Sequence, residues 1–368
     1  MKGETEMPTR QTHMINVKID NEILNSILSI EKNKDSLNLV KIPVNLSNRF
    51  RKNTKKRSSY ASNRIEGNPL TFEQADAAIE SNNRHFLMPE QEIRNYYLAL
   101  ELLEKKLEVK EPLSLKLLLQ VQKQICSGEP KEKIGLRGAM PPGVLFAVWN
   151  DDGTPSYIPP EYSEVPVLLN ELFDYINESD DHPLIKAAII HYQLVTIHPF
   201  EDGNGRTARI ISSYFLSLSG YGFKNIGSLE EYMSYNIDEY YDSLQMNLPV
   251  LYYDGRNNPP HPEVWIKYYL KIFSLYASKV LSIALKETSN NENERLSHLS
   301  NKAKQFLEYL NRHNIIRFAP IDLSYKLKVT NRTIINWCSE LAKNGYIMPI
   351  VVEKRIRQYE VITENDDE

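Results

Sequence analysis

The chain has 368 residues, a formal net charge of −4, 41% hydrophobic residues and 25% charged residues. This composition excludes a wholly disordered chain and a uniformly basic nucleic-acid coat, and the length allows about two to three domains. Two cysteines, Cys126 and Cys338, are too few for a disulfide framework, and no stretch approaches the ~18 consecutive apolar residues of a membrane span. We therefore expect a globular cytoplasmic protein with no membrane partner.

The first part of the chain predicts a helical core behind a polar extension. Residues 1–54 are predicted to be an N-terminal extension, and the basic segment 49–57 is interpreted as a solvated helix or loop. From about Leu70 to Leu285 apolar residues recur at three- and four-residue spacing, which predicts an α-helical core domain. Residues 144–149 and 156–158 flank a turn rich in Asn and Asp, so a β-hairpin flap is expected near 142–158.

A second, smaller domain is predicted after residue 300. Residues 286–300 lose their apolar residues and predict a linker or the exposed start of a helix. Residues 301–363 give three helices and two β-type runs, the order of a small winged helix-turn-helix (α+β) domain, and 364–368 form an acidic tail. Within this domain, residues 321–362 resemble a winged helix. Its expected first helix is 323–327, its recognition helix is 331–344 and its wing is 348–361. A local basic excess permits DNA binding, although winged helices also bind proteins. The residues expected to face DNA are Asn331, Arg332, Thr333, Lys354, Arg355 and Arg357.

A polar, glycine-rich loop joins two predicted helices between residues 183 and 218. The first helix carries apolar residues on two faces, which predicts that it is buried, and it ends at His198. Gly203 and Gly205 allow the backbone of the loop to aim successive N–H groups at one point, at the N-terminus of the second helix. The loop is therefore predicted to be an anion cradle.

Charged residues around the cradle indicate phosphate chemistry. Arg206 and Arg209 lie on the first turn of the second helix, where their guanidinium groups suit a polyphosphate better than a lone carboxylate. Asp202 offers a hard oxygen ligand for Mg²⁺. The imidazole of His198 can accept a proton from an incoming hydroxyl near neutral pH. Together these residues predict nucleotidyl or phosphoryl transfer.

The segment HPFEDGNGRTAR, residues 198–209, resembles the H-x-F-x-[DE]-G-N-G-R-x-x-R signature of the Fic family. The resemblance covers about residues 55–285 and implies a protein adenylyltransferase, which moves AMP from Mg-ATP to a Ser, Thr or Tyr hydroxyl of a target protein or of itself. It implies that His198 deprotonates the hydroxyl, Asp202 holds Mg²⁺ and Phe200 anchors the loop as an apolar plug. It assigns the ATP phosphates to Gly203, Asn204, Gly205, Arg206, Thr207, Ala208 and Arg209.

An inhibitory element is predicted upstream. The segment from Ser62 to Gly67 resembles the family's inhibitory motif [ST]-x-x-x-E-[GN]. Gly67 and Pro69 are expected to end a short helix near 57–67, which leaves Glu66 in a last turn where the helix dipole disfavours a carboxylate and a nearby cation would compensate. The resemblance implies that this cation is Arg209 and that the pairing keeps the γ-phosphate from seating productively. An exposed glutamate at a helix end is the alternative.

The resemblance also implies docking sites. A flap upstream of the loop holds the target in Fic proteins, and an exposed strand edge can pair with an extended segment; a plain surface hairpin is the alternative. Tyr240, Tyr241 and Leu244 resemble a YYxxL stretch that lines the adenine pocket in some relatives, and otherwise they are core residues. Dimerisation is common in relatives, so a homodimer is a further expectation.

Three other functions stay open at this point. The chain could be a DNA-binding regulator whose Fic domain senses nucleotide, although the intact His198 counts against it. It could be a Fic enzyme that uses another nucleotide, transfers a phosphate or removes AMP. A zinc hydrolase using His191, His198 and Asp202 is the third, but the spacing matches no recognised zinc pattern.

Overall fold

The computed structural model describes residues 15–362 except 82, 84, 151, 253–258 and 353–354. The chain divides into two compact units, Met1–Ala284 and Leu285–Glu368. The extension before residue 15, the acidic tail 364–368 and Lys354 of the predicted wing lie outside the described residues. Within the described part, no helix is both long enough and apolar enough to cross a membrane.

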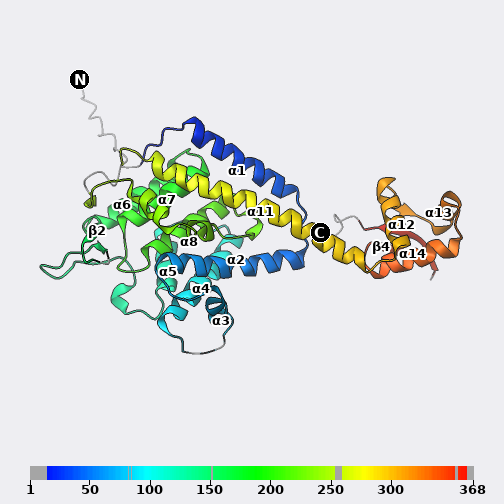
Figure 1. The fold of residues 1–368 in the computed structure, drawn as a ribbon, viewed down its shortest axis with the longest axis horizontal. Coiled ribbons are helices and arrows are strands. Elements are labelled where there is room, and N and C mark those ends of the chain that lie inside the picture. The colour runs from blue at the N-terminus through cyan, green and yellow to red at the C-terminus, as the bar shows by residue number, and fades with distance from the viewer. Residues whose placement is uncertain are drawn as a thin grey trace, which may run out of the picture. The chain divides into compact units, whose positions relative to one another are not determined.

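The first unit is helical apart from one short hairpin, as expected (Figure 1). Its helices are α1 (Asn21–Leu39), α2 (Val44–Ile65), α3 (Phe72–Glu80), α4 (Met88–Glu108), α5 (Leu115–Ile125), α6 (Val165–Glu178), α7 (Pro183–Ile197), α8 (Asn204–Leu218), α9 (Leu229–Met233) and α10 (Ile237–Gln245), with the 3-10 helices η1 (Lys131–Lys133) and η2 (Phe223–Asn225). Helix α11 (Glu263–Ser297) begins in this unit and continues past its last residue, Ala284.

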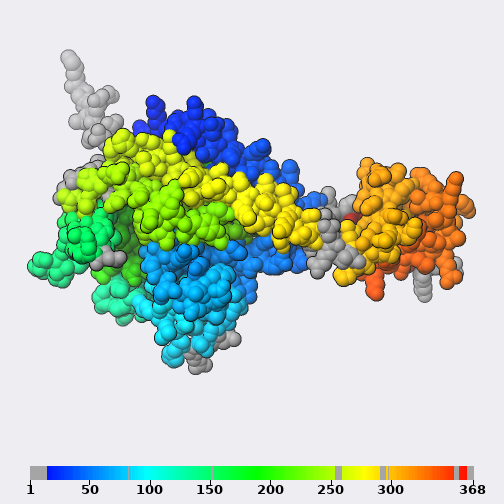
Figure 2. Space-filling view, in the orientation of Figure 1, coloured from blue at the N-terminus to red at the C-terminus, as the bar shows by residue number. Residues whose placement is uncertain are grey.

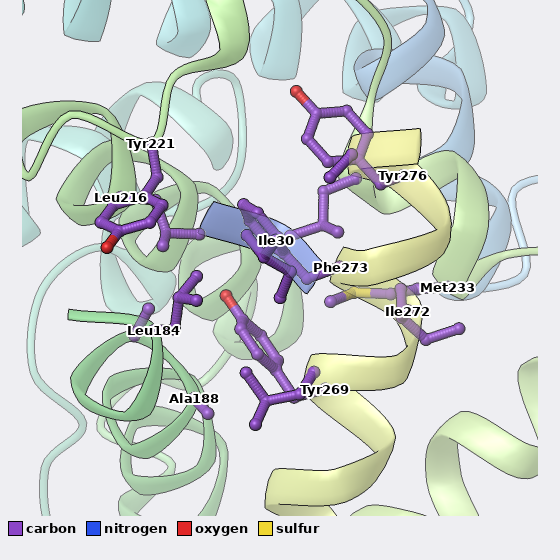
Figure 3. Close-up of a cluster of buried hydrophobic side chains, with 14 of the residues drawn as sticks. Ile30, Leu184, Ala188, Leu216, Tyr221, Met233, Tyr269, Ile272, Phe273 and Tyr276 are labelled. Carbon is purple, nitrogen blue, oxygen red and sulfur yellow. The ribbon is translucent and has the colours of Figure 1, made fainter. Parts of the chain in front are cut away.

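Helix α7 lies between two apolar clusters and is buried on almost every side, as its two apolar faces predict. One face joins a cluster with α1 and α11, in which Ile30, Ala188 and Phe273 meet (Figure 3). The other face, including Leu194, packs against α4, α5, α6 and α8. Apolar burial on both sides holds the end of α7 in place, because each Å² removed from water contributes about 25 cal/mol.

Helix α1 packs lengthwise on α11, and the two run side by side in the ribbon and on the surface (Figures 1 and 2). The hydroxyl of Ser29 lies 3.3 Å from that of Ser274, and Lys267 pairs with Asp20 at 2.7 Å. Part of the predicted polar extension is therefore a structural helix of the first unit.

One prediction about the next segment is corrected and another is refined. The inhibitory helix predicted near 57–67 is the last part of the 22-residue helix α2, because no glycine or proline interrupts the chain between Pro43 and Gly67. The basic segment inside it is helical and mostly exposed, as expected, but two of its lysines are half-buried in ion pairs. Lys55 pairs with Glu104 at 3.0 Å, and Lys56 pairs with Glu80 at 2.7 Å, so α2 is bound through ion pairs to α3 and α4.

The predicted flap is present but shorter than expected. Strand β1 (Val148–Trp149) pairs antiparallel with β2 (Pro155–Tyr157). Residues 144–147 are not in a strand, because the N–H of Val144 instead donates to the carbonyl of Pro141 in a turn. The hydroxyl of Tyr157 donates to the carbonyl of Thr196 at 2.5 Å, which anchors the hairpin to the end of α7.

The second unit has its own core and sheet. It contains α12 (Asn301–Arg312), β3 (Arg317–Phe318), α13 (Pro320–Leu327), α14 (Asn331–Lys343), β4 (Ile347–Val352) and β5 (Arg355–Val361), with strand order β3-β5-β4. Phe306, Leu310, Ile334 and Leu341 are buried among these elements. Residues 286–297, for which a linker or the exposed start of a helix was expected, are helical and form the last turns of α11.

Candidate active site

The loop between α7 and α8 has the backbone that its glycine predicts. His198 ends α7 with φ +50°, and Gly203 caps α8 with φ +80°, where a Cβ would lie 2.9 Å from the Cys126 sulfur. The side-chain amide of Asn204 donates to the Phe200 carbonyl at 2.8 Å and accepts from the Phe200 N–H at 3.0 Å. Phe200 itself is buried in the apolar cluster that α7 forms with α4, α5, α6 and α8. The Asn204 amide therefore shapes the loop.

The imidazole of His198 is held in one tautomer. Its Nδ1 lies 3.1 Å from the carbonyl oxygen of Val195, and because a carbonyl only accepts, Nδ1 carries the proton and Nε2 keeps its lone pair. Arg137 donates to the His198 carbonyl at 2.8 Å, and the Phe146 ring lies beside the imidazole. Burial lowers the pKa of His198 from 6.5 to about 4. The side chain is thus a neutral base with a free Nε2.

Arg209 is buried and bound on all of its nitrogens. Its Nη2 lies 2.7 Å from Oε1 of Glu66 and 2.9 Å from the Ser62 carbonyl. Its Nε donates to the Ser62 hydroxyl at 2.9 Å, and Nη1 donates to the Tyr240 hydroxyl at 3.3 Å. The predicted contact of Glu66 with Arg209 is present, and Ser62 contributes two further hydrogen bonds to the same guanidinium group.

The carboxylate of Glu66 stands over the first turn of α8. A Cβ placed on Gly205 would collide with Oε1 of Glu66 and would lie 3.1 Å from Nη1 of Arg209. Only glycine leaves room for a carboxylate at this point. The N-terminus of a helix attracts anions through its free N–H groups and its dipole. Glu66 therefore occupies the anion-attracting position that the sequence predicted for phosphates.

Arg206 is held by two carboxylates, one of which the sequence analysis missed. Its Nη2 pairs with Asp202 at 2.9 Å, and its Nη1 lies 3.3 Å from Oε1 of Glu92 on α4. The other carboxylate oxygen of Glu92 accepts from the side chain of Asn68, which lies two residues after Glu66, at 2.8 Å. No motif marks Glu92, because its role comes from a contact between distant segments.

Two donors beside the loop have no partner among the described residues. These are Nε of Arg206 and the hydroxyl of Thr207, both buried. Unpaired buried donors cost free energy, so they favour an incoming acceptor such as a phosphate oxygen. The methyl group of Ala208 is buried in the cluster that α7 forms with α4, α5, α6 and α8, so a contact of Ala208 with phosphate, as the motif predicts, would be made by its backbone.

Asp202 fits a magnesium ion that arrives with phosphates. Its Oδ1 accepts from the Gly203 N–H at 2.5 Å and from Arg206, while Oδ2 lies 3.9 Å from Nζ of Lys133. Mg²⁺ uses one or two carboxylates together with waters and phosphate oxygens, so a single half-exposed carboxylate suits it. Over the described residues, no group of three His, Cys, Asp or Glu side chains is placed to hold a metal. The zinc site considered for His191, His198 and Asp202 is therefore not formed by the described residues. Nε2 of His191 instead contacts the Tyr240 hydroxyl at 2.9 Å.

The three residues predicted for the adenine pocket lie in two environments. Tyr240 and Leu244 are buried, and the Tyr240 hydroxyl accepts a hydrogen bond from Nη1 of Arg209. Tyr241 is 45% exposed, and its hydroxyl donates to the carbonyl of Ile65, next to Glu66, at 3.2 Å. Of the three, Tyr241 alone presents a free aromatic surface beside the loop.

The sequence around the loop between α7 and α8 is similar to known proteins. Residues 112–216 match the Fic/DOC family. A protein adenylyltransferase Fic of Drosophila virilis is 27% identical over 202 residues, which cover 53% of this chain and 39% of that protein. A protein adenylyltransferase Fic of Drosophila willistoni is 30% identical over 169 residues, which cover 44% of this chain and 32% of that protein. The chain therefore spans about two fifths or less of the length of these relatives.

Solved structures share the fold. A Fic family protein from Desulfovibrio desulfuricans G20 superposes with a TM-score of 0.57 and 19% identity, over 95% of this chain and 98% of that one. Residues 134–508 of Fic-1 from C. elegans superpose with a TM-score of 0.56 and 24% identity, over 72% of this chain and 73% of that one. The mostly helical architecture expected from the sequence is thus the one that these neighbours have.

Proposed function

We propose that this chain, which carries a Fic domain across residues 112–216, is a protein adenylyltransferase that Glu66 holds in an inhibited state. The observation that carries the proposal is the unprotonated Nε2 of His198 at the end of α7, in the loop that leads to the N-terminus of α8 with Arg206 and Arg209. A neutral base and a double guanidinium clamp are what transfer of a nucleotidyl group to a hydroxyl requires.

The reaction follows from these groups. Nε2 of His198 takes the proton of a Ser, Thr or Tyr hydroxyl, and the oxygen attacks the α-phosphorus of ATP. The bond between the α-phosphorus and the bridging oxygen breaks, and pyrophosphate leaves. Arg206, Arg209 and the N–H groups of α8 offset the negative charge of the phosphates. Mg²⁺ held by Asp202 would supply further charge neutralisation.

Inhibition follows from the position of Glu66. Its carboxylate and a terminal phosphate would compete for the guanidinium group of Arg209 and for the N-terminus of α8. Both are anions that need the same donors, so only one can bind there at a time. ATP can then bind in its productive pose only when the carboxylate moves away.

The flap completes the proposal as a docking place for the target. Phe146 lies beside the imidazole of His198, and Val144, Leu145 and Trp149 are largely exposed. An extended segment of a target that lay along the hairpin would bring its hydroxyl toward Nε2 of His198. The proposed target is therefore a protein, with the chain's own hydroxyls as substitutes.

The test uses ATP labelled at either end. The purified chain is incubated with Mg²⁺ and ATP carrying the label on the α-phosphate or on the γ-phosphate, and label on protein is measured. The proposal expects transfer of the α-label alone. Transfer of the γ-label would instead establish phosphoryl transfer, and competition by unlabelled UTP or GTP would show another nucleotide preference.

The pH profile of the same assay tests the state of His198. Because burial lowers the pKa of His198 to about 4, the base stays unprotonated through the neutral range. We expect kcat/KM for self-labelling to be flat with respect to this group from about pH 5.5 to 8 and to fall with a midpoint near pH 4. Circular dichroism at each pH controls for unfolding. A midpoint near 6.5 would contradict the assigned environment of the imidazole.

Glu92→Gln tests the second carboxylate on Arg206. The amide removes the negative charge that holds Nη1 but keeps the size of the side chain. We expect the KM for ATP to fall about two- to fivefold with little change in kcat, since a partly exposed ion pair contributes about 0.5–1 kcal/mol. Glu73→Gln, at an exposed position on α3, is the matched control. An unchanged or higher KM would show that Glu92 does not restrain Arg206.

A further inference from the structure

A second pocket lies in the first unit, and no residue of the loop 198–209 lines it. It has a volume of about 140 Å³ and is bounded by α2, α4, α8, α9, α11 and the η2 segment. A cavity of about 150 Å³ accommodates benzene, so this pocket suits a ligand of about six heavy atoms. Leu216, Tyr221, Phe273 and Tyr276 of its wall lie around the α1–α7–α11 cluster (Figure 3).

The pocket contains one unmatched negative charge. Glu230 is 3% exposed and accepts hydrogen bonds from Ser58 at 3.0 Å, Ser228 at 2.9 Å and Tyr96 at 3.3 Å. Among the residues that the structure describes, no Lys, Arg or His forms an ion pair with this carboxylate. A buried carboxylate without a cation favours a cationic ligand.

The cations that line the pocket are bound to other carboxylates. Arg51 and Lys55 pair with Glu104 of the wall at 3.1 and 3.0 Å, and Lys55 also pairs with Glu101, which lies outside the wall, at 3.2 Å. Neither cation therefore forms an ion pair with Glu230.

Aromatic rings and a strained backbone form the rest of the wall. Tyr214, Tyr221, Phe273 and Tyr276 line the pocket, and the faces of aromatic rings attract cations. In the adjoining η2 segment, residues 223–225 have φ values of +44°, +52° and +55° without any glycine. Such strain is typical of functional sites, and the Thr54 hydroxyl of α2 binds the carbonyl of Asn225 at 2.7 Å.

The pocket shares a face of α2 with the inhibitory contact. Ser58, Ser62 and Glu66 follow one another at four-residue spacing, which aligns them along the helix. Ser58 binds Glu230, while Ser62 and Glu66 bind Arg209. A cation that takes over the carboxylate of Glu230 competes with the Ser58 hydroxyl, and so loosens α2 from α9 one turn before Ser62.

We propose that this pocket binds a small organic cation, an ammonium group on Glu230 with an apolar body against the tyrosine and phenylalanine rings, and that its binding weakens the contact of Glu66 with Arg209. The second part of this proposal, the effect on the contact of Glu66 with Arg209, rests on the proposed function in one respect: it takes ATP to be the anion that replaces the Glu66 carboxylate. The site itself stands on the pocket, its charge and its aromatic wall.

Binding is tested on the full chain with two probes of equal size, pentylammonium and the neutral 1-pentanol, by calorimetric titration and thermal unfolding. Pentylammonium is expected to bind at least tenfold more tightly. Glu230→Gln is expected to lower its affinity by tenfold or more, and Ser213→Phe, which fills the pocket, should abolish binding. Glu231→Gln, a neighbouring carboxylate outside the pocket, is the matched control. Equal affinity of the two probes, or affinity unchanged in both pocket variants, would overturn the site.

Coupling is tested by ATP binding, which does not depend on any transfer reaction. Pentylammonium is expected to raise the affinity for ATP severalfold in the wild type and to leave it unchanged in Glu66→Gly, where the inhibitory contact is already absent. An ATP affinity that pentylammonium leaves unchanged in the wild type would overturn the coupling. Failure of α-label transfer in every variant would count against the proposed function and leave both binding results standing.

Discussion

Replacing His198 with alanine is expected to lower the rate of α-label transfer by about 10²- to 10⁴-fold, the usual contribution of a general base. The hydroxyl of a serine or tyrosine holds its proton tightly near pH 7, and Nε2 of His198 is the free acceptor at the loop. Because the imidazole contacts Val195 and Phe146, and within the described part of the chain neither Arg206 nor Arg209 contacts it, ATP binding should stay within about twofold of the wild type. Label transfer and ATP titration on the same preparation measure both.

His261→Ala is the matched control for this experiment, because His261 is an exposed histidine whose contact is the carboxylate of Glu263 at 3.3 Å. It should leave transfer unchanged. A His198→Ala protein that binds ATP normally and still transfers the label would show that another group accepts the proton. Loss of ATP binding together with transfer would mean that the imidazole supports the loop more than the chemistry.

The sequence was sufficient wherever local pattern decides structure. The apolar faces of 183–197 predicted a buried helix, and the glycines after it predicted a loop whose backbone takes conformations that other residues avoid, as Gly203 does with φ +80°. The pairing of Glu66 with Arg209 was predicted from the family resemblance alone. The two residues are far apart in the chain, so no local pattern could have shown that they meet.

Long-range packing set the limits of prediction. The basic charges of α2 suggested a solvated segment, yet Lys55 and Lys56 are matched by carboxylates of α3 and α4, elements that no local pattern aligns with them. Glu92 and Glu230 were missed for the same reason: each is an ordinary glutamate in sequence, and only the fold places one on Arg206 and buries the other. Charge alone does not tell which surface a side chain meets.

Replacing Glu66 with glycine is expected to raise the initial rate of α-label transfer by about ten- to hundredfold. A hydrogen bond to a charged group contributes about 1.5–3 kcal/mol, and about 1.4 kcal/mol is a factor of ten. This is the free energy that ATP would have to overcome to take Arg209 and the N-terminus of α8 from the carboxylate. Without the carboxylate both are open to the terminal phosphate, so the gain should appear in ATP affinity as well as in rate.

The same change has a cost in stability that provides an internal check. Arg209 stays buried without its anion in Glu66→Gly, so the free energy of unfolding of the unliganded protein should fall by about 2 kcal/mol, less than for a fully buried pair because Glu66 is partly exposed. ATP should then raise Tm more in Glu66→Gly than in the wild type, since the phosphate replaces the lost anion. Glu108→Gly, at the exposed end of α4, controls for a glycine at a helix terminus. If Glu66→Gly lost stability but gained neither ATP affinity nor rate, the ion pair would be structural, and the inhibition would have to lie elsewhere.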